Sequence, residues 1–176
     1  AQNQNPLTKL PGNKQSDNFI QKVFKKNINA HIVYFDFNDF KPFNDYYGFR
    51  QGDRAILMFS EILQKNISNE HFVAHIGGDD FFVGFLEKDF EEVYSLIHKS
   101  QVDFKNCASS LYSEEDLKNK FIFAKDRFGV DRKFDLLSVS AAIIEIKKNC
   151  QLETFNSNLS KIKKYSKEVP YPLAIC

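Results

Sequence analysis

Residues 72–85 read FVAHIGGDDFFVGF, which is the most informative stretch of the sequence for the fold. Residues 72–76 and 81–85 are short apolar segments rich in β-branched and aromatic side chains, which is typical of buried strands. The connection between them is Gly77-Gly78-Asp79-Asp80, and glycine-rich connections of this length are typical of tight hairpin turns. We therefore expect a β-hairpin whose turn carries two adjacent carboxylates.

A second apolar run, residues 30–37, contains Asp36 as its only acid and indicates a strand buried on both faces. Further strands are expected over residues 137–146 and 172–176. Residues 100–133 are polar and show no dominant period, although a small helix is expected near 113–119. Apolar residues at helical spacing predict helices after a capping group at 16–18, over 40–47, from 52, over 89–97 and around 152–162.

This order of helices and strands favours an α+β fold. It fits a ferredoxin-like βαββαβ palm-type core, with a mainly antiparallel central sheet flanked by helices and with added elements. The length of 176 residues fits one domain. Ala1 opens the chain without a Met, and residues 172–176 resemble an unfinished strand. We therefore expect residues 1–176 to be a single domain excised from a larger protein.

The net charge of +1 argues against bulk electrostatic binding to a nucleic acid polymer. No apolar run reaches membrane-spanning length, and no signal peptide opens the sequence. Cys107, Cys150 and Cys176 are far apart and form no C-x-x-C pair, which argues against a structural zinc site. Reduced thiols in a cytoplasmic protein are the simplest interpretation, and the parent protein could still be attached to a membrane.

The acids suggest a chemical role. A carboxylate that ends an apolar strand, as Asp36 does, is costly unless it is paired, solvated or bound to metal. The two glycines of the turn let a ligand approach closely. Adjacent carboxylates such as Asp79 and Asp80 repel each other, and hard oxygen ligands suit Mg²⁺. Taken separately, an exposed strand end or helix cap also explains Asp36, and an ordinary hairpin with exposed acids explains the turn.

Four blocks in order resemble the GGDEF domain of bacterial diguanylate cyclases. The turn at residues 77–81 reads GGDDF, close to the signature GGDEF. Residues 7–13, LTKLPGN, resemble the opening D-x-L-T-G-L-P-N-R segment. Residues 36–45, DFNDFKPFND, resemble the D-x-D-x-F-K-x-x-N-D block, and residues 48–53, GFRQGD, resemble the G-H-x-x-G-D block. Together these blocks cover about the first half of the chain.

A weaker resemblance covers the later half. Residues 111–116, 124–127 and 137–140 are similar to an insertion and strand found in GGDEF domains attached to EAL and CBS modules. The resemblance therefore implies a multidomain parent that could carry such modules.

The resemblance implies condensation of two GTP molecules into cyclic di-GMP with release of pyrophosphate, by two GGDEF domains that meet as a homodimer. It implies that Asp36, the backbone carbonyl of Phe37 and Asp79 hold Mg²⁺ or Mn²⁺. Asp79 and Asp80 would be the catalytic acids of the turn. Such a protein positions its substrates and neutralises their charge, as phosphoryl-transfer sites do generally.

The resemblance also implies how GTP is held. Asn44 and Asp53 match positions that hydrogen-bond the guanine edge. Lys163 and Lys167 are four residues apart, so they share one helix face and could contact phosphate, although a solvated basic helix end explains them equally well. The phosphate-binding positions implied nearer the N-terminus are Asn38, Asp39, Phe40 and Lys41.

The sequence departs from the family pattern at several points. Asn5 stands where the opening block has Asp, and Asp80 stands where the signature has Glu. His75 replaces a common Arg before the turn. Residues 68–71 read SNEH where the inhibitory product site would have R-x-x-D, so product inhibition there is not expected. His71 and His75 could form a metal pair or be two separately hydrogen-bonded histidines.

Three hypotheses follow. The first is an active diguanylate cyclase domain. The second is a catalytically weak or inactive GTP-binding GGDEF domain that regulates an attached cyclic-di-GMP phosphodiesterase (EAL) module. The third is a dimerisation module with a relic site.

Overall fold

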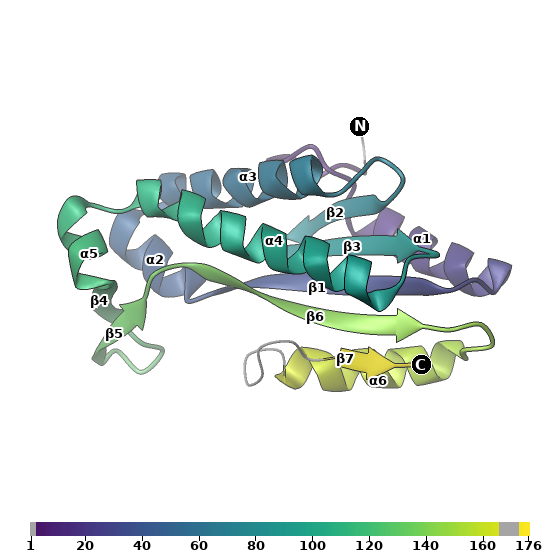
Figure 1. Ribbon diagram of the computed structural model, residues 1–176. Coiled ribbons are helices and arrows are strands. Elements are labelled where there is room, and N and C mark those ends of the chain that lie inside the picture. Colours follow the sequence, from purple (N-terminus) through teal and green to yellow (C-terminus); the bar gives the residue numbers. More distant parts are fainter. Residues whose placement is uncertain (1–2, 166–172) are drawn as a thin grey trace.

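The central sheet of the computed structural model has the strand order β2-β3-β1-β6-β7, and the structure describes residues 3–165 and 173–176 (Figure 1). All neighbouring strands pair antiparallel except β6 and β7, which are parallel. The order of elements confirms the expected α+β fold with a βαββαβ core. The strands are β1 (Ala30–Asn38), β2 (Phe72–Gly77), β3 (Asp80–Leu86), β6 (Ser138–Ile146) and β7 (Leu173–Ile175).

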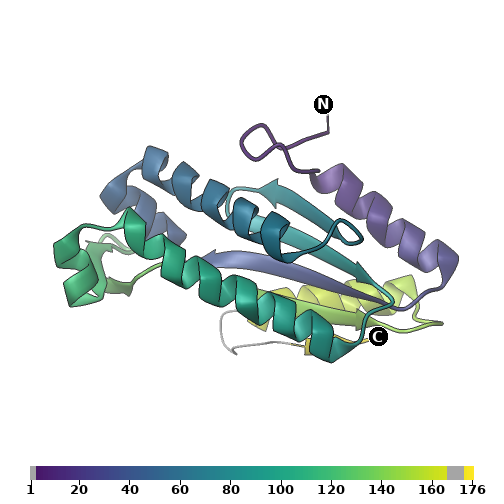
Figure 2. The same ribbon diagram turned by 45° about the horizontal axis from the view of Figure 1, so that its top comes forward.

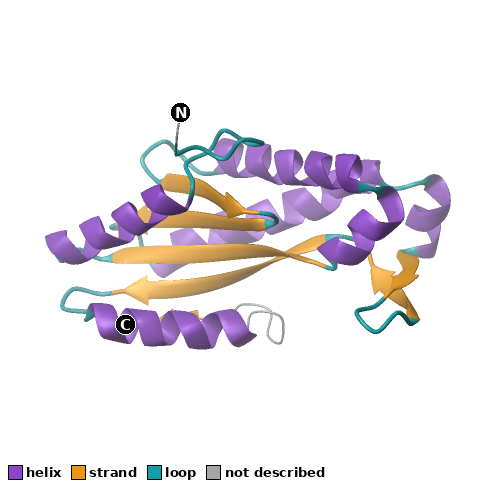
Figure 3. Cartoon of the chain, turned by 180° about the vertical axis from the view of Figure 1, so that it is seen from behind, coloured by secondary structure: helices purple, strands orange, loops and turns teal. Residues whose placement is uncertain are grey.

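Helices cover both faces of this sheet (Figures 2 and 3). Helices α3 and α4 lie on one face, and α1 and α6 lie on the other. The helices are α1 (Asn13–Lys26), α2 (Phe40–Tyr47), α3 (Phe49–Asn66), α4 (Phe90–Ala108), α5 (Glu114–Asn119) and α6 (Leu152–Tyr165), with a 3₁₀ turn at Ser109–Leu111.

Strand β1 contributes to two separate cores because its side chains alternate between the faces. Val33 and Phe35 belong to the cluster under α3 and α4, whereas Ile32 belongs to the cluster with Val23 of α1 and Phe155 of α6. The continuous apolar run in the sequence therefore reflects a strand buried on both faces, as expected.

Several helix boundaries differ from the expected ones. Helix α1 begins at Asn13, before the expected cap at residues 16–18, because Gly12 is its N-cap and Gln15 accepts a hydrogen bond from the Gly12 N–H. Helix α3 begins at Phe49 and includes Gly52. Helix α4 continues to Ala108, through a stretch whose polar surface obscured its period.

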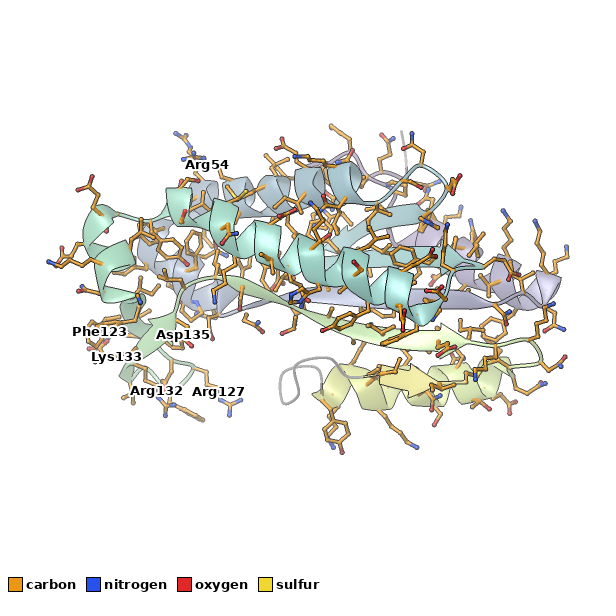
Figure 4. The ribbon with its side chains drawn as sticks, in the orientation of Figure 1. Arg54, Phe123, Arg127, Arg132, Lys133 and Asp135 are labelled. Atoms are coloured by element: carbon orange, nitrogen blue, oxygen red, sulfur yellow. A yellow bond between two sulfur atoms is a disulfide. The ribbon has the colours of Figure 1, made fainter. Side chains whose placement is uncertain are left out.

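A two-stranded sheet of β4 (Phe121–Lys125) and β5 (Asp131–Asp135) was missed by the sequence interpretation. Its residues are mostly exposed, so the strands lack the apolar alternation that marks a half-buried strand. Gly129, at φ +77°, forms the turn. This hairpin projects beside α2 and α5, and Phe123, Lys133 and Asp135 mark it in Figure 4.

The prediction of three reduced thiols is wrong for two of them. Cys150 and Cys176 form a disulfide with a Cα–Cα distance of 5.5 Å, and Cys107 is a free, exposed cysteine. The fold brings these residues together because β7 pairs with β6 and Cys150 lies just after β6. The expected terminal strand is confirmed as β7. Within residues 3–165 and 173–176, no helix has the length and apolar character needed to cross a membrane.

Candidate functional site

Asp36, Asp79 and Asp80 meet at one end of the sheet. One carboxylate oxygen from each lies within 4.8 Å of the others. The strand register produces this cluster, because Asp36 of β1 lies directly opposite Asp80 of β3. Residues opposite each other in an antiparallel pair share a face and bring their Cβ atoms to about 5 Å. Asp79, in the turn between β2 and β3, completes the group.

The carboxyl group of Asp79 has a raised pKa. Burial raises the pKa of Asp79 to about 7, and a hydrogen bond with Asp36 and the charge of Asp36 add to the shift. The larger part of the shift is the cost of removing a carboxylate from water, and the smaller part is the cost of placing negative charges close together. A bound cation would remove this cost, and three carboxylates form a hard-oxygen donor set that suits Mg²⁺ or Mn²⁺.

A cavity of about 160 Å³ adjoins these acids. Its lining includes Asp36, Asp80, Ser140 and Lys163, so the cation of α6 and the acids of the sheet share one space. Pockets that enclose whole ligands measure about 300–1,000 Å³. The cavity is therefore suited to one end of a nucleotide, such as part of its phosphate chain, and the remainder would lie outside it.

The turn is held in place by His75, whose role the sequence did not reveal. Its Nε2 lies 2.7 Å from the carbonyl oxygen of Gly78, and its Nδ1 lies 3.0 Å from Oγ1 of Thr8. The ring is 2% exposed and stacks on Phe81 at 4.5 Å. Gly78 has φ +51°, which glycine adopts without strain. The only sign of this role in the sequence was that His75 stands before the turn at a position where the GGDEF family commonly has Arg.

Asn44, predicted to bind guanine, packs against a glycine. A Cβ built on Gly52 would lie 1.9 Å from Oδ1 of Asn44, so only glycine leaves room for this side chain. The same Oδ1 is buried and has no hydrogen-bond partner among the residues that the structure describes. An unpaired buried acceptor is costly, and it suits a ligand that donates hydrogen bonds. Asp53 is exposed on the next helix, α3.

The residues around the start of α2 are placed as follows. Asn38 ends β1, and its side chain donates to Ser138 at 2.9 Å and accepts from Ser140 at 2.8 Å. Asp39 takes a left-handed conformation at φ 59°, and α2 begins at Phe40. Phe37 pairs with Val139 in the β1–β6 ladder. The backbone N–H groups at the start of a helix suit phosphate. The phosphate-binding role of this segment stays a prediction.

Of two further lysines predicted to contact phosphate, the structure describes Lys41 but not Lys167. Lys41 donates to Asp45, one turn along α2, at a distance of 2.8 Å, and both side chains are exposed. Its predicted contact with phosphate would require it to leave this ion pair, which is a weak surface interaction. Lys167 lies outside the described residues, so its predicted role stays a prediction.

A larger cavity borders residues 68–71, where the sequence differs from the family's inhibitory-site pattern. Ser68, Glu70 and His71 line a space of about 730 Å³ that also borders the first turn of α4. His71 precedes β2, and His75 is bonded to Thr8 and Gly78. Among the described parts of the chain, the acids at the turn are the only group of three or more candidate ligands.

Among protein families, the one described as "Diguanylate cyclase, GGDEF domain" matches residues 2–118. Among curated proteins, the bifunctional diguanylate cyclase/cyclic di-GMP phosphodiesterase MucR of Pseudomonas aeruginosa is 29% identical over 97 residues, or 53% of this chain and 14% of MucR. The signaling protein YkoW of Bacillus subtilis is 31% identical over 81 residues, or 44% of this chain and 10% of YkoW. The chain thus matches a small part of each relative's length.

Solved GGDEF domains share the fold. That of DgcB from Caulobacter crescentus, in complex with c-di-GMP, has a TM-score of 0.71 at 17% identity, covering 99% of this chain and 96% of that chain. That of FimX from Pseudomonas aeruginosa has a TM-score of 0.63 at 13% identity, covering 98% of both chains. At these identities the likeness establishes the fold alone.

Proposed function

The chain belongs to the GGDEF family of diguanylate cyclase domains, and from that premise we propose that it condenses two GTP molecules into cyclic di-GMP. The observation that carries this proposal is the cluster of Asp36, Asp79 and Asp80, with their carboxylate oxygens within 4.8 Å of one another. Three acids in this arrangement repel one another, and a bound cation would relieve that repulsion. A metal–triphosphate substrate would bring that cation with it.

The metal ion in this proposal is Mg²⁺ or Mn²⁺, held by Asp36, Asp79 and the backbone carbonyl of Phe37. When bound, the ion would neutralise phosphate charge and favour ionisation of the attacking hydroxyl. Asp79, in the turn beside the metal, is placed to accept a proton from the 3′-hydroxyl. Asp80 would add charge beside the same atoms.

The remaining contacts would orient the nucleotide. Asn44 and Asp53 would bind the guanine edge, since the Oδ1 of Asn44 is a buried acceptor with no partner among the described residues. Lys163 would contact the phosphates, since it lines the cavity shared with Asp36. The start of α2, with Lys41, would contribute further phosphate contacts.

Each domain would hold one GTP, so the reaction requires a second copy of the domain. Two bound nucleotides would face each other, each 3′-hydroxyl attacking the other's α-phosphate with loss of pyrophosphate. Related proteins combine such domains with others: MucR is a bifunctional cyclase/phosphodiesterase, and one structural neighbour is the S helix-GGDEF-EAL part of LapD from Vibrio cholerae. We infer that the parent protein carries comparable modules of the EAL or CBS type.

Turnover at high protein concentration tests this function. GTP is incubated with the chain and Mg²⁺ or Mn²⁺ over a series of protein concentrations, and the nucleotides are separated by chromatography. We expect cyclic di-GMP to form at a rate that rises more steeply than protein concentration, because two domains must meet. Asp79→Asn should abolish it, whereas Asp135→Asn, on the β4–β5 hairpin, should not (Figure 4).

The outcome separates the hypotheses. GTP binding without product at every concentration would overturn the cyclase proposal in favour of a GTP-binding domain that regulates a neighbouring module. Concentration-dependent association without any nucleotide binding would leave a dimerisation module.

A further inference from the structure

The aromatic ring of Tyr34 lies against the ammonium group of Lys163. The Nζ atom of Lys163 is 4.2 Å from the ring centroid. A cation within about 6 Å of a ring centroid is attracted by the negative face of the ring. Both residues line the cavity of about 160 Å³ that Asp36 and Asp80 also line. The pair therefore belongs to the acidic pocket, although neither the metal nor the catalytic roles involve Tyr34.

The ring of Tyr34 is fixed by the sheet. Tyr34 precedes Asp36 by two residues on β1, so both side chains lie on the same face. Its ring meets Phe82 edge to face, with centroids 5.3 Å apart, and Phe82 is fully buried. On the other side, β6 places Ala142 opposite Tyr34. Ala142 lines the same cavity as Tyr34 and Lys163.

Lysine by itself is poorly suited to hold a defined position. Its ammonium is a compact charge on a flexible four-carbon stem, unlike the planar fork of arginine. Beside carboxylates it is also drawn toward the acids, which would compete with its contact to phosphate. A fixed aromatic face offers the ammonium a neutral resting position in the same cavity.

We propose that Tyr34 is a positioning residue that holds the Lys163 ammonium over the acidic pocket, ready for the polyphosphate of the bound nucleotide. This inference rests on the proposed function, because it assigns the polyphosphate of GTP to Lys163. Positioning before binding reduces the conformational freedom that the lysine loses on binding. The contact involves the ring face, so the hydroxyl of Tyr34 is not required.

Calorimetric titration of the whole chain with Mg²⁺–GTP tests this proposal. Tyr34→Leu removes the ring and should weaken binding by about three- to tenfold, the range of a cation–π contact. Tyr34→Phe keeps the ring and should bind GTP as the parent chain does. Guanosine, which has no phosphate, should bind all three proteins equally. Thermal unfolding of each variant checks that the fold is retained.

A double-mutant cycle separates positioning from a structural role. In a Lys163→Met background, Tyr34→Leu should cause no further loss of GTP affinity, because the two residues act through one contact. Additive losses would overturn the proposal, as would a Tyr34→Phe variant that binds as weakly as Tyr34→Leu.

Titration with Mg²⁺–tripolyphosphate distinguishes a failure of the proposed function from a failure of the Tyr34 positioning role. If the parent chain binds Mg²⁺–tripolyphosphate but not GTP, guanine recognition fails, and the same cycle measured with tripolyphosphate decides the role of Tyr34. If it binds neither compound, both the function and the positioning role are overturned.

Discussion

The Nε2 atom of His75 lies 2.7 Å from the carbonyl oxygen of Gly78, so a buried imidazole holds the turn that carries the acids. Since a carbonyl only accepts, Nε2 donates, and Nδ1 is left to accept from the hydroxyl of Thr8. The neutral tautomer therefore satisfies both contacts. Burial lowers the pKa of His75, which favours this neutral form.

Replacing this imidazole should loosen the turn. His75→Ala removes the hydrogen bonds to the Thr8 hydroxyl and the Gly78 carbonyl and leaves a void beside the buried ring of Phe81, so we expect a loss of about 2–4 kcal/mol in the free energy of unfolding. Thr8→Val removes only one of the contacts and should cost about half as much. Urea unfolding measures both. Equal losses for the two variants would show that the contact with Gly78 contributes nothing.

Removing a charge at the strand end should stabilise the metal-free protein. Asp36 and Asp80 face each other across β1 and β3, and like charges in such a pair cost up to about 1 kcal/mol. We expect Asp80→Asn to raise the melting temperature by about 2–4 °C in EDTA. It should reduce the further rise that Mn²⁺ produces.

Asp135→Asn is the matched control for this experiment, because it removes one exposed charge from the β4–β5 hairpin. It should leave the Mn²⁺ effect unchanged. An Asp80→Asn variant that responds to Mn²⁺ as the parent chain does would remove Asp80 from the cation site.

Adding one methyl group beside Asn44 should impair guanine recognition. The new Cβ of Gly52→Ala would collide with Oδ1 of Asn44. We expect GTP affinity to fall by about tenfold, the equivalent of one lost hydrogen bond, with tripolyphosphate binding unchanged. Calorimetry measures both ligands. If Asn44 is the cause, adding Gly52→Ala to an Asn44→Ala variant should weaken GTP binding no further.

The acids of the site could be predicted because they lie in short, contiguous motifs. Asp36 ends an apolar run, and Asp79 and Asp80 follow two glycines, so local pattern made each a candidate, and the resemblance to the GGDEF family implied that they share one site. The contact of His75 with Thr8 could not be predicted, because it joins residues 67 positions apart and depends on where the segment before α1 packs. The β4–β5 hairpin escaped notice for another reason: solvent covers most of it, so no hydrophobic period marks its strands.

For Tyr34 too, the local sequence predicts its place in a strand but not its contact with a residue far along the chain. Its place on β1 follows from sequence, whereas its contact with Lys163 depends on where α6 packs. Pairing of Cys150 with Cys176 likewise depends on β7 joining the sheet beside β6. Residue type and spacing define candidates in each case, but long-range packing decides which of them meet.

Acid should destabilise the fold through its buried histidines. His31 is 3% exposed, and neither ring nitrogen has a hydrogen-bond partner within the described part of the chain. Burial lowers the pKa of His31, although nearby Glu145 and Asp89 oppose the shift. The unfolded chain therefore binds a proton more readily than the folded one. Stability should be fully present above about pH 6.5 and fall as the pH drops below that value.

One such histidine can contribute at most about 1.4 kcal/mol between pH 7.5 and 5.5. Urea unfolding at several pH values measures this slope. His31→Phe removes the titrating group, and its slope should be smaller by up to that amount. A variant with the same slope as the parent chain would assign the acid sensitivity to other groups.

Reducing the disulfide should loosen the C-terminal part of the sheet. Cys150 and Cys176 are 26 positions apart. Closing a loop of that size lowers the conformational entropy of the unfolded chain, which stabilises the folded state by about 3–4 kcal/mol. We expect dithiothreitol to lower the free energy of unfolding by about this amount in a Cys107→Ser background. The Cys150→Ser variant should not respond to the reductant. Three titratable thiols in the native, unreduced parent chain would contradict the pairing.

Strand β1 also limits how this chain can change over evolutionary time. Its odd-numbered side chains fill one core and its even-numbered side chains fill the other, with Asp36 on the even side. Inserting or deleting one residue before Asp36 would exchange the two sets and turn the acid into the apolar layer beneath α3 and α4. Individual side chains of β1 can be replaced by others of similar volume, but indels of odd length within it should be eliminated by selection.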